Sequence, residues 1–219
     1  MNIILLAPPA AGKGTQSSFL EKYYHLKHIS TGDLLREVLK ENTPEAEEIR
    51  QVINSGKLVS DDIILNLIEK VLTSGQSSEG YILDGFPRTK LQAEEYDLLL
   101  NRIDQKIDYV LCFDVDKQIL KKRIVGRLLC KECGSIFNEY FDIKKPKEEG
   151  ICDHCSAKLT KRSDDNEESF EHRYDVYLKE TKPLIEYYEK KGILYHVPFG
   201  ETPDQVFAEI KTIIEGKND

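Results

Sequence analysis

The sequence predicts an α/β protein, a five-stranded parallel sheet with helices on both faces. Short apolar runs alternate with stretches of helical spacing, and a glycine-bearing loop joins the first run to a helix. Apolar residues form 40% of the 219-residue chain, enough for a sizeable core. Parallel strands with right-handed crossovers place helices on both faces. The predicted strands occupy residues 3–6, 26–29, 81–83, 109–115 and 193–197.

The first apolar run leads into the loop 7–15, A-P-P-A-A-G-K-G-T, and then into a helix. This order indicates a P-loop, because successive backbone N–H groups and a helix N-terminus converge on a phosphate there. Lys13 would reach the outer phosphates. The strict pattern G-x-x-x-x-G-K-[ST] fails twice, since Ala7 holds the first glycine position and Gly14 follows the lysine. A strand-to-helix turn with a solvated lysine is the alternative.

Three helices without an intervening strand follow the second apolar run. Ser30 is an N-cap signal for the first, Pro44 opens the second, and Ser60 caps the third. This order predicts a helical excursion from the sheet. His25 and His28 are interpreted as surface or packing residues rather than ligands.

The later runs carry further candidate residues. Asp84 ends the third run, where an acid beside a P-loop holds magnesium directly or through water. Cys112 lies within the fourth run and is interpreted as a core residue. A helix predicted over 116–128 would carry Arg123 and Arg127 on one face, four residues apart. A later helix, from about residue 167, carries Arg173, and a last helix spans 206–214.

Four of the five cysteines follow the spacing C-x2-C-x18-C-x2-C, at Cys130, Cys133, Cys152 and Cys155. This spacing is typical of a structural zinc site with two tight turns and four thiolates. A disulfide pair and unpartnered cysteines are the alternatives. His154 lies inside the second turn, but four thiolates already complete such a site.

Six of the eight arginines fall in segments that a doubly wound sheet brings to its carboxyl edge. They are Arg36, Arg88, Arg123, Arg127, Arg162 and Arg173. The guanidinium fork suits phosphate oxygens, although single arginines could be ordinary partners of the many acids. With the P-loop and Asp84, and without an evident nucleophile, this set predicts phosphoryl transfer.

The composition narrows the class of partner. A net charge of −8 argues against nucleic acid, whose phosphates are met by basic surfaces. The sequence shows neither a signal-peptide pattern nor a run of about 20 apolar residues. We therefore expect a cytoplasmic protein that binds no membrane, and nothing in the sequence suggests more than a monomer.

The sequence resembles the adenylate kinases, specifically those whose lid carries a structural zinc. The resemblance covers the whole chain and is most specific in the segments 30–36 (STGDLLR), 56–59 (GKLV), 83–88 (LDGFPR) and 123–127 (RIVGR), and in Arg162, Asp164, Asp165 and Arg173. It implies the P-loop nucleoside monophosphate kinase fold and direct in-line transfer of the terminal phosphoryl of MgATP to AMP in a closed site that excludes water. It also implies a core of residues 1–29, 60–125 and 166–219, an AMP-binding domain of 30–59 and a zinc-binding lid of 126–165.

The resemblance also implies a role for each matching position. The ATP phosphates would be held by Ala10, Ala11, Gly12, Lys13, Gly14 and Thr15, with Arg127 along the ATP side and Ile136, Phe137 and Thr202 near its base. The transferring group would be neutralised by Arg88, Arg123, Arg162 and Arg173. AMP would be bound by Thr31, Arg36, Lys57, Leu58, Val59, Gly85, Phe86, Pro87, Arg88, Gln92, Arg162 and Arg173. Gln92 would read the adenine, and Asp84 would hold a magnesium-bound water.

Two departures from the family pattern G-x-P-G-x-G-K-G-T carry expectations. Ala7 and Ala10 replace glycines, and we predict that Ala10 keeps a negative φ while ATP affinity is reduced but not lost. Glu171 and His172 stand where basic residues are frequent. A kinase for UMP, CMP or GMP is one alternative, which Gln92 and the long lid disfavour. A nucleotide-binding protein with impaired turnover is another.

Overall fold

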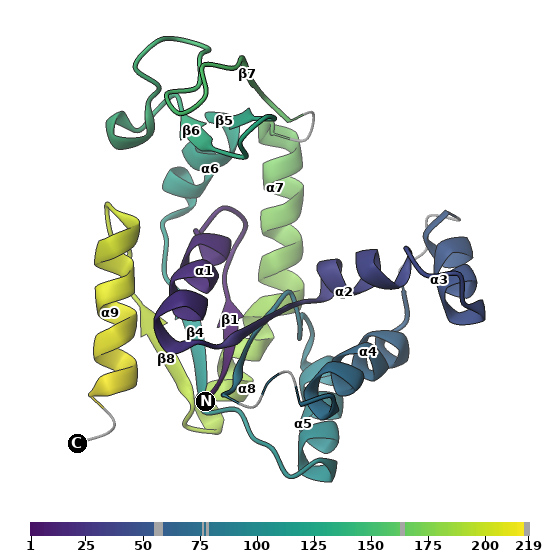
Figure 1. The fold of residues 1–219 in the computed structure, drawn as a ribbon. Helices are drawn as coiled ribbons and strands as arrows, with labels where there is room; N and C mark the ends of the chain where they lie inside the picture. Colours follow the sequence, from purple (N-terminus) through teal and green to yellow (C-terminus); the bar gives the residue numbers. More distant parts are fainter. Residues whose placement is uncertain (55–58, 76, 78, 163–164, 217–219) are drawn as a thin grey trace. The chain divides into compact units, whose positions relative to one another are not determined.

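The computed structural model describes residues 1–54, 59–75, 77, 79–162 and 165–216. Their elements follow one another in the order shown in Figure 1. The strands are β1 (Asn2–Leu6), β2 (Lys27–Ser30), β3 (Tyr81–Asp84), β4 (Tyr109–Phe113), β5 (Arg127–Cys130), β6 (Ile136–Asn138), β7 (Leu159–Thr160) and β8 (Leu194–Val197). The helices are α1 (Lys13–Tyr24), α2 (Thr31–Val38), α3 (Pro44–Asn54), α4 (Asp61–Thr73), α5 (Lys90–Arg102), α6 (Lys117–Val125), α7 (Glu167–Val176), α8 (Lys182–Lys190) and α9 (Pro203–Glu215), with a 3-10 turn η1 (Asp142–Lys144) and a π-helical turn η2 (Tyr177–Thr181).

The described residues form two compact units. The first comprises residues 1–7, 12–113 and 180–219, and the second comprises 8–11 and 114–179. The division into a core, an AMP-binding domain and a lid stays a prediction.

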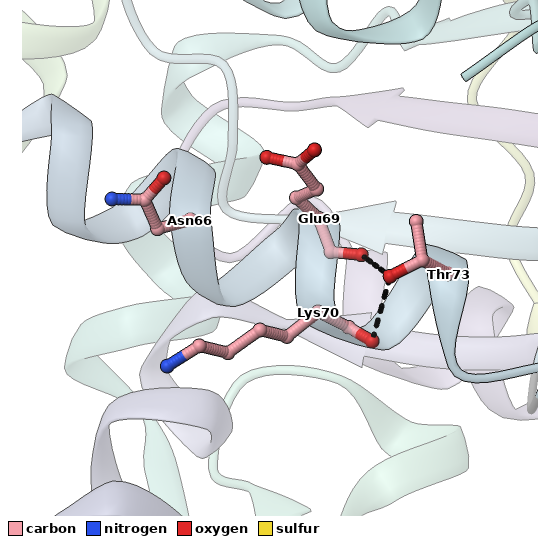
Figure 2. Close-up of a pocket in the computed structure, with 4 residues that line it drawn as sticks. All are labelled: Asn66, Glu69, Lys70 and Thr73. Atoms are coloured by element: carbon pink, nitrogen blue, oxygen red, sulfur yellow. Dashed lines mark hydrogen bonds between the residues drawn. The ribbon is translucent and has the colours of Figure 1, made fainter.

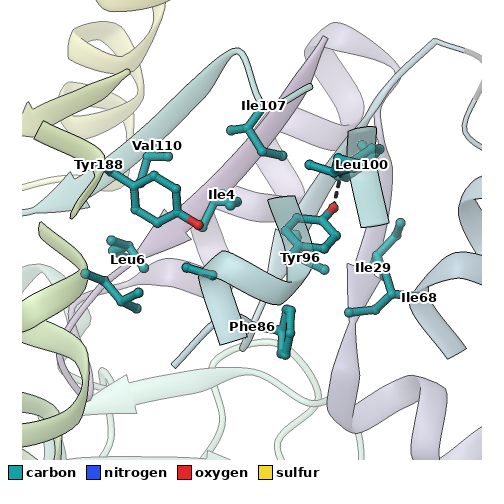
Figure 3. Close-up of a cluster of buried hydrophobic side chains, with 14 of the residues drawn as sticks. Ile4, Leu6, Ile29, Ile68, Phe86, Tyr96, Leu100, Ile107, Val110 and Tyr188 are labelled. Carbon is teal, nitrogen blue, oxygen red and sulfur yellow. Dashed lines mark hydrogen bonds between the residues drawn. The ribbon is translucent and has the colours of Figure 1, made fainter. Parts of the chain in front are cut away.

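The first unit contains the predicted five-stranded parallel sheet, in the order β2-β3-β1-β4-β8. The central strands β1, β3 and β4 are largely buried apolar runs, as parallel strands covered on both faces require, whereas the edge strands β2 and β8 each include an exposed residue. Ile4 and Leu6 of β1 belong to a cluster with side chains of α5 and α8, and the alternate residues Ile3 and Leu5 are equally buried. Figure 3 shows the cluster that contains Ile4 and Leu6, in which Phe86, Tyr96 and Tyr188 lie among aliphatic side chains.

Local signals explain where the helices of this unit begin. The Ser30 hydroxyl accepts a hydrogen bond from the Asp33 N–H at the start of α2, as the sequence predicts. Pro183 lies in the first turn of α8, a position that proline favours, directly after the π-helical turn η2. Among the described residues, none of the helices combines the length and the apolar character that a membrane span requires.

The second unit contains a three-stranded antiparallel sheet, β6-β5-β7, and two helices, α6 and α7. Side chains of Cys130, Phe137, Cys152 and Leu159 form a small apolar cluster at this sheet, and Leu120, Ile124 and Phe170 of the two helices are buried as well. The cluster at the sheet is small and therefore supplies little hydrophobic stabilisation there.

The expectation that one helix spans 116–128 is wrong, because α6 ends at Val125. Asn138 of β6 donates from Nδ2 to the Arg123 carbonyl over 3.0 Å and closes the helix end. A Cβ on Gly126 would lie 2.6 Å from Asn138 Oδ1, so only glycine fits this approach. Arg127 therefore begins strand β5, and the two arginines do not share a helix face.

Candidate active site

The loop between β1 and α1 has a backbone that accepts glycine more readily than alanine. Ala10 has φ 65°, so the prediction of a negative φ is wrong. The Ala11 N–H donates to the Pro8 carbonyl over 3.3 Å, which closes a turn with Pro9 second and Ala10 third. A proline second and a positive φ third are features of a type II turn, which favours glycine third. The turn thus imposes on Ala10 a conformation that costs about 1–2 kcal/mol.

Arg123 of α6 also holds this turn. Its Nη1 donates to the carbonyls of Ala10 and Ala11, over 3.4 and 3.2 Å. Burial lowers the pKa of the Arg123 guanidinium, but arginine stays charged near neutral pH. Gly12 follows with φ 99° as N-cap of α1, so the helix N-terminus begins at Lys13. N–H groups after such a loop are suited to bind an anion.

Lys13 and Asp84 meet at the carboxyl edge of the parallel sheet. Asp84 is the last residue of β3 and pairs in register with Leu5 of β1. The Lys13 Nζ lies 2.8 Å from Asp84 Oδ1. The structure thus brings together the predicted phosphate-binding lysine and the predicted magnesium-binding acid.

His28 of β2 joins this pair through the second carboxylate oxygen. Its Nε2 lies 3.5 Å from Asp84 Oδ2. Burial raises the pKa of the Asp84 carboxyl, but His28 and Lys13 outweigh burial and hold that pKa below its ordinary value. The sequence interpretation of His28 as a surface or packing residue misses this contact. His28 lies two residues before Ser30, which pairs in register with Asp84. Alternate residues of a strand share a face, so this spacing was the available signal.

The segment after β3 packs closely on the start of α2. A Cβ on Gly85, whose φ is 87°, would lie 3.0 Å from the buried Thr31 Oγ1. Arg88 is exposed, and its Nε donates to the Gly85 carbonyl over 3.0 Å. Phe86 and Pro87 are buried. The segment 85–88 and Thr31, which are all predicted to bind AMP, therefore lie next to each other in the first unit.

Other predicted AMP-binding residues have partners of their own. Arg36 is exposed and forms an ion pair with Asp33, one helical turn earlier. Val59 is partly buried, whereas Lys57 and Leu58 lie outside the described residues.

Gln92 completes a capping box at the start of α5. Its Nε2 donates to Asp61 Oδ1 over 2.7 Å, and its Oε1 accepts from the backbone N–H groups of Arg88 and Thr89. The pattern T-x-x-Q at 89–92 signals this cap, which the sequence interpretation overlooked. An adenine would therefore have to share or displace these partners.

The remaining arginines among the predicted site residues belong to the second unit. Arg127 forms a bidentate ion pair with Asp165, whose side chain is fully buried. Arg162 and Arg173 are exposed, the latter on α7. Glu171 of α7 pairs with Lys117 and Lys121 of α6, which accounts for an acid at that position.

The residues predicted to border the ATP base differ in exposure. Ile136 is 52% exposed, whereas Phe137 is buried in the core of the second unit. Phe137 therefore offers a ligand its backbone rather than its ring. Thr202 is the N-cap of α9, and its backbone N–H donates to Gln205 Oε1.

The four spaced cysteines form one cluster, with all four sulfurs within 4.8 Å of one another. The Sγ atoms of Cys130 and Cys155 are 3.3 Å apart, and those of Cys133 and Cys152 are 3.5 Å apart. Four thiolates about 2.3 Å from a tetrahedral zinc stand about 3.8 Å apart, so the cluster fits this metal. The cysteines form no disulfide. His154 lies outside the cluster, beside the Phe137 ring.

The two cysteine turns share one backbone pattern. Gly134 donates its N–H to the Cys130 carbonyl over 3.0 Å, and Ser156 donates to the Cys152 carbonyl over 2.9 Å. Both donors have positive φ, 74° and 59°. Two equivalent turns present four thiols to one point, an arrangement that a single ion can bridge.

A further surface depression lies on α4, lined by Asn66, Glu69, Lys70 and Thr73 (Figure 2). Its residues come from consecutive turns of one helix, and Glu69 is paired with Arg102. None of the four is a predicted site residue, so this depression takes no part in the candidate active site.

The sheet order, the loop before α1 and the lysine beside a strand-end acid define a P-loop nucleoside monophosphate kinase fold. A family model described as adenylate kinase matches residues 5–193. An adenylate kinase of Geobacillus sp. (strain WCH70) is 40% identical over 99% of both chains. Those of Syntrophobacter fumaroxidans and Clostridioides difficile are 44% and 42% identical, covering 98% and 96% of this chain and 100% and 96% of their own. The chain belongs to the adenylate kinase family.

Proposed function

We propose that this chain transfers the terminal phosphoryl group of MgATP to AMP and so forms two molecules of ADP. The relatives are named adenylate kinases and match almost the whole chain. The observation that carries the proposal is the Lys13–Asp84 pair, which sets a cation and a carboxylate at the sheet edge where α1 begins. This edge is where α/β proteins bind phosphates.

In the proposed reaction an oxygen of the AMP phosphate attacks the terminal phosphorus of ATP in line with the bridging oxygen. The bond between that phosphorus and the bridging oxygen breaks, and ADP leaves. Lys13 and the backbone of residues 10–15 hold the ATP phosphates. Arg88, Arg123, Arg162 and Arg173 neutralise the transferring group, and Arg127 lies along the ATP side. Most of the catalysis is then alignment and charge neutralisation in a site closed to water.

Magnesium bound with ATP would neutralise the charge of the phosphate oxygens. Asp84 suits this ion, because its pKa is held low and the carboxylate is therefore charged at neutral pH. In the proposal Asp84 orients a magnesium-bound water rather than the ion itself.

On the acceptor side, we assign the AMP phosphate to Arg36 and Arg88. Thr31, residues 57–59 and the segment 85–87 line the nucleotide. Gln92 contacts the adenine, which requires a rearrangement of its hydrogen bonds to Asp61 and the capping box. Ile136, the backbone of Phe137 and the backbone near Thr202 border the ATP base.

We further propose that the four-cysteine cluster binds one structural zinc ion, which cross-links the two turns of the second unit. The support is the fit of the sulfur spacing and the small apolar core around it. The proposed reaction uses groups of one chain, and we infer a cytoplasmic monomer that binds neither nucleic acid nor a membrane. The net charge of −8 argues against nucleic acid as a partner.

The deciding experiment measures ADP formation from ATP with AMP, UMP, CMP or GMP as acceptor. We expect fastest turnover with AMP and a rate near background for the variant K13M, with K22M as a matched lysine control. Fastest turnover with UMP would show that UMP, and not AMP, is the preferred phosphoryl acceptor. ATP binding without turnover would instead support an impaired nucleotide-binding protein, which the methyl group of Ala10 in the loop makes a specific alternative.

A further inference from the structure

Within the described part of the chain, the Asp84 carboxylate has ion-pair contacts with Lys13 and His28, and the proposed reaction assigns no role to His28. Its register partner on β3 is Ile82, while Ser30 pairs with Asp84. Alternate residues of a strand point to the same face, so His28 and Asp84 are diagonal neighbours on one face. The backbone register thus places the imidazole beside this carboxylate.

The two oxygens of the Asp84 carboxylate have different partners. Oδ1 is 2.8 Å from Lys13 Nζ, and Oδ2 is 3.5 Å from His28 Nε2. His28 Nε2 is buried and has no closer hydrogen-bond partner among the described residues. A small rotation of either ring or carboxylate shortens this contact to a normal hydrogen bond. The imidazole is therefore available for Asp84.

This arrangement matters because Lys13 cannot pair equally well with the Asp84 carboxylate and with the ATP phosphates. In the proposed function Lys13 binds the ATP phosphates, so it must weaken its contact with Asp84. The Asp84 side chain is only 17% exposed, and a carboxylate in such a place needs another donor. Without one, Asp84 would compete with the phosphates for the lysine.

We propose that His28 is a positioning residue that holds Asp84 through Oδ2 and so releases Lys13 to the ATP phosphates. This inference rests on the proposed function. The donated hydrogen bond also fixes the direction in which the carboxylate faces. His28 thereby acts on ATP and on magnesium-bound water through Asp84, without touching either nucleotide.

The test compares H28L, H28Q and H28N with the wild-type protein. Glutamine carries an amide N–H about as far from the backbone as the imidazole Nε2, whereas asparagine is shorter by one carbon and leucine cannot donate. We expect H28L and H28N to raise the Kd for MgATP, measured by calorimetry without AMP, about three- to tenfold. We expect kcat to fall by a similar factor while the KM for AMP stays unchanged, and H28Q to recover most of both losses.

The exposed His25 supplies the control, as H25N, because asparagine tolerates the left-handed backbone at this position. A structural role alone would lower the melting temperature without the split between ATP and AMP and without rescue by glutamine. Unchanged MgATP affinity in H28L, or equal losses in H28Q and H28L, would overturn the inference. An inactive wild-type protein would instead refute the proposed function, so the two failures are distinguishable.

Discussion

Residue 10 shows how one methyl group can set the properties of a phosphate-binding loop. Ala10 has φ 65° in a turn that favours glycine. We expect A10G to relieve about 1–2 kcal/mol of backbone strain, offset in part by about 0.5–1 kcal/mol from the greater freedom of glycine in the unfolded chain. The melting temperature should therefore change little, while removal of the methyl lowers the KM for ATP in steady-state assays. Ala7 has no positive φ, so A7G relieves no strain. An equal gain in both variants would contradict this account.

The charge of a second residue, His28, makes a pH-dependent contribution to stability. The nearby Asp84 carboxylate raises the pKa of His28 above 6.5, although burial opposes this, and Glu21 and Asp33 add weaker attraction. Lys13 faces the same carboxylate. The folded state thus binds this proton more tightly than the unfolded chain. The contribution is fully present below about pH 6.5 and is lost as pH rises through the raised pKa.

We therefore expect the wild-type protein to exceed H28Q in melting temperature by more at about pH 5.5 than at about pH 8.5. Thermal melts in magnesium-free buffer check this, since magnesium would change the charge around Asp84. The difference should be small because His28 is partly exposed. A difference that grows with pH would contradict the sign.

At the scale of elements, α6 and α7 are joined by ion pairs. Lys117 lies 2.6 Å from Glu171, and Lys121 lies 2.8 Å from Glu167. Lys117 also lies over the Tyr174 ring, 4.9 Å from its centre. We expect E171K to lower the melting temperature by a few degrees at most, because exposed pairs contribute little and the new lysine faces two others. The effect should shrink in about 1 M salt. The neighbouring E168K is the control, and an equal effect there would refute the role of these pairs.

The elements also show what the sequence could and could not predict. The central strands β1, β3 and β4 were predictable because each is a short, largely buried apolar run. The edge strand β2 has only Ile29 buried, yet its observed bounds, 27–30, differ by one residue from the prediction. The end of α6 was not, because it depends on Asn138 reaching back to its last turn. Gly126 was the only local signal. The capping of Gln92 by Thr89 was visible in the sequence, but its bond to Asp61 depends on the packing of α4 on α5.

For the whole molecule, the cysteine cluster was predictable because each pair lies in a local turn of fixed spacing. The contact of His28 with Asp84 was not, because it depends on which strands of the sheet are neighbours. The positive φ of Ala10 had a signal in Pro9, but the glycine-like turn overrode the preference of alanine. Residue chemistry was thus easier to predict than the partners that the fold gives each residue.

The two units should respond differently to removal of a metal. The cysteine cluster lies wholly in the second unit, where the apolar cluster at the three-stranded sheet has only four buried side chains, whereas the first unit has an extensive apolar core. We expect the purified protein to contain one zinc per chain, and chelation to lower the protection of backbone amides in β5, β6 and β7 while the five-stranded sheet keeps its own. Hydrogen exchange read peptide by peptide measures both. C133S should reproduce the loss, and C112A, which changes a buried cysteine outside the four-cysteine cluster, should retain the metal. Equal loss of protection in both sheets would show that the metal stabilises the whole molecule, and a protein without zinc would remove the proposed cross-link.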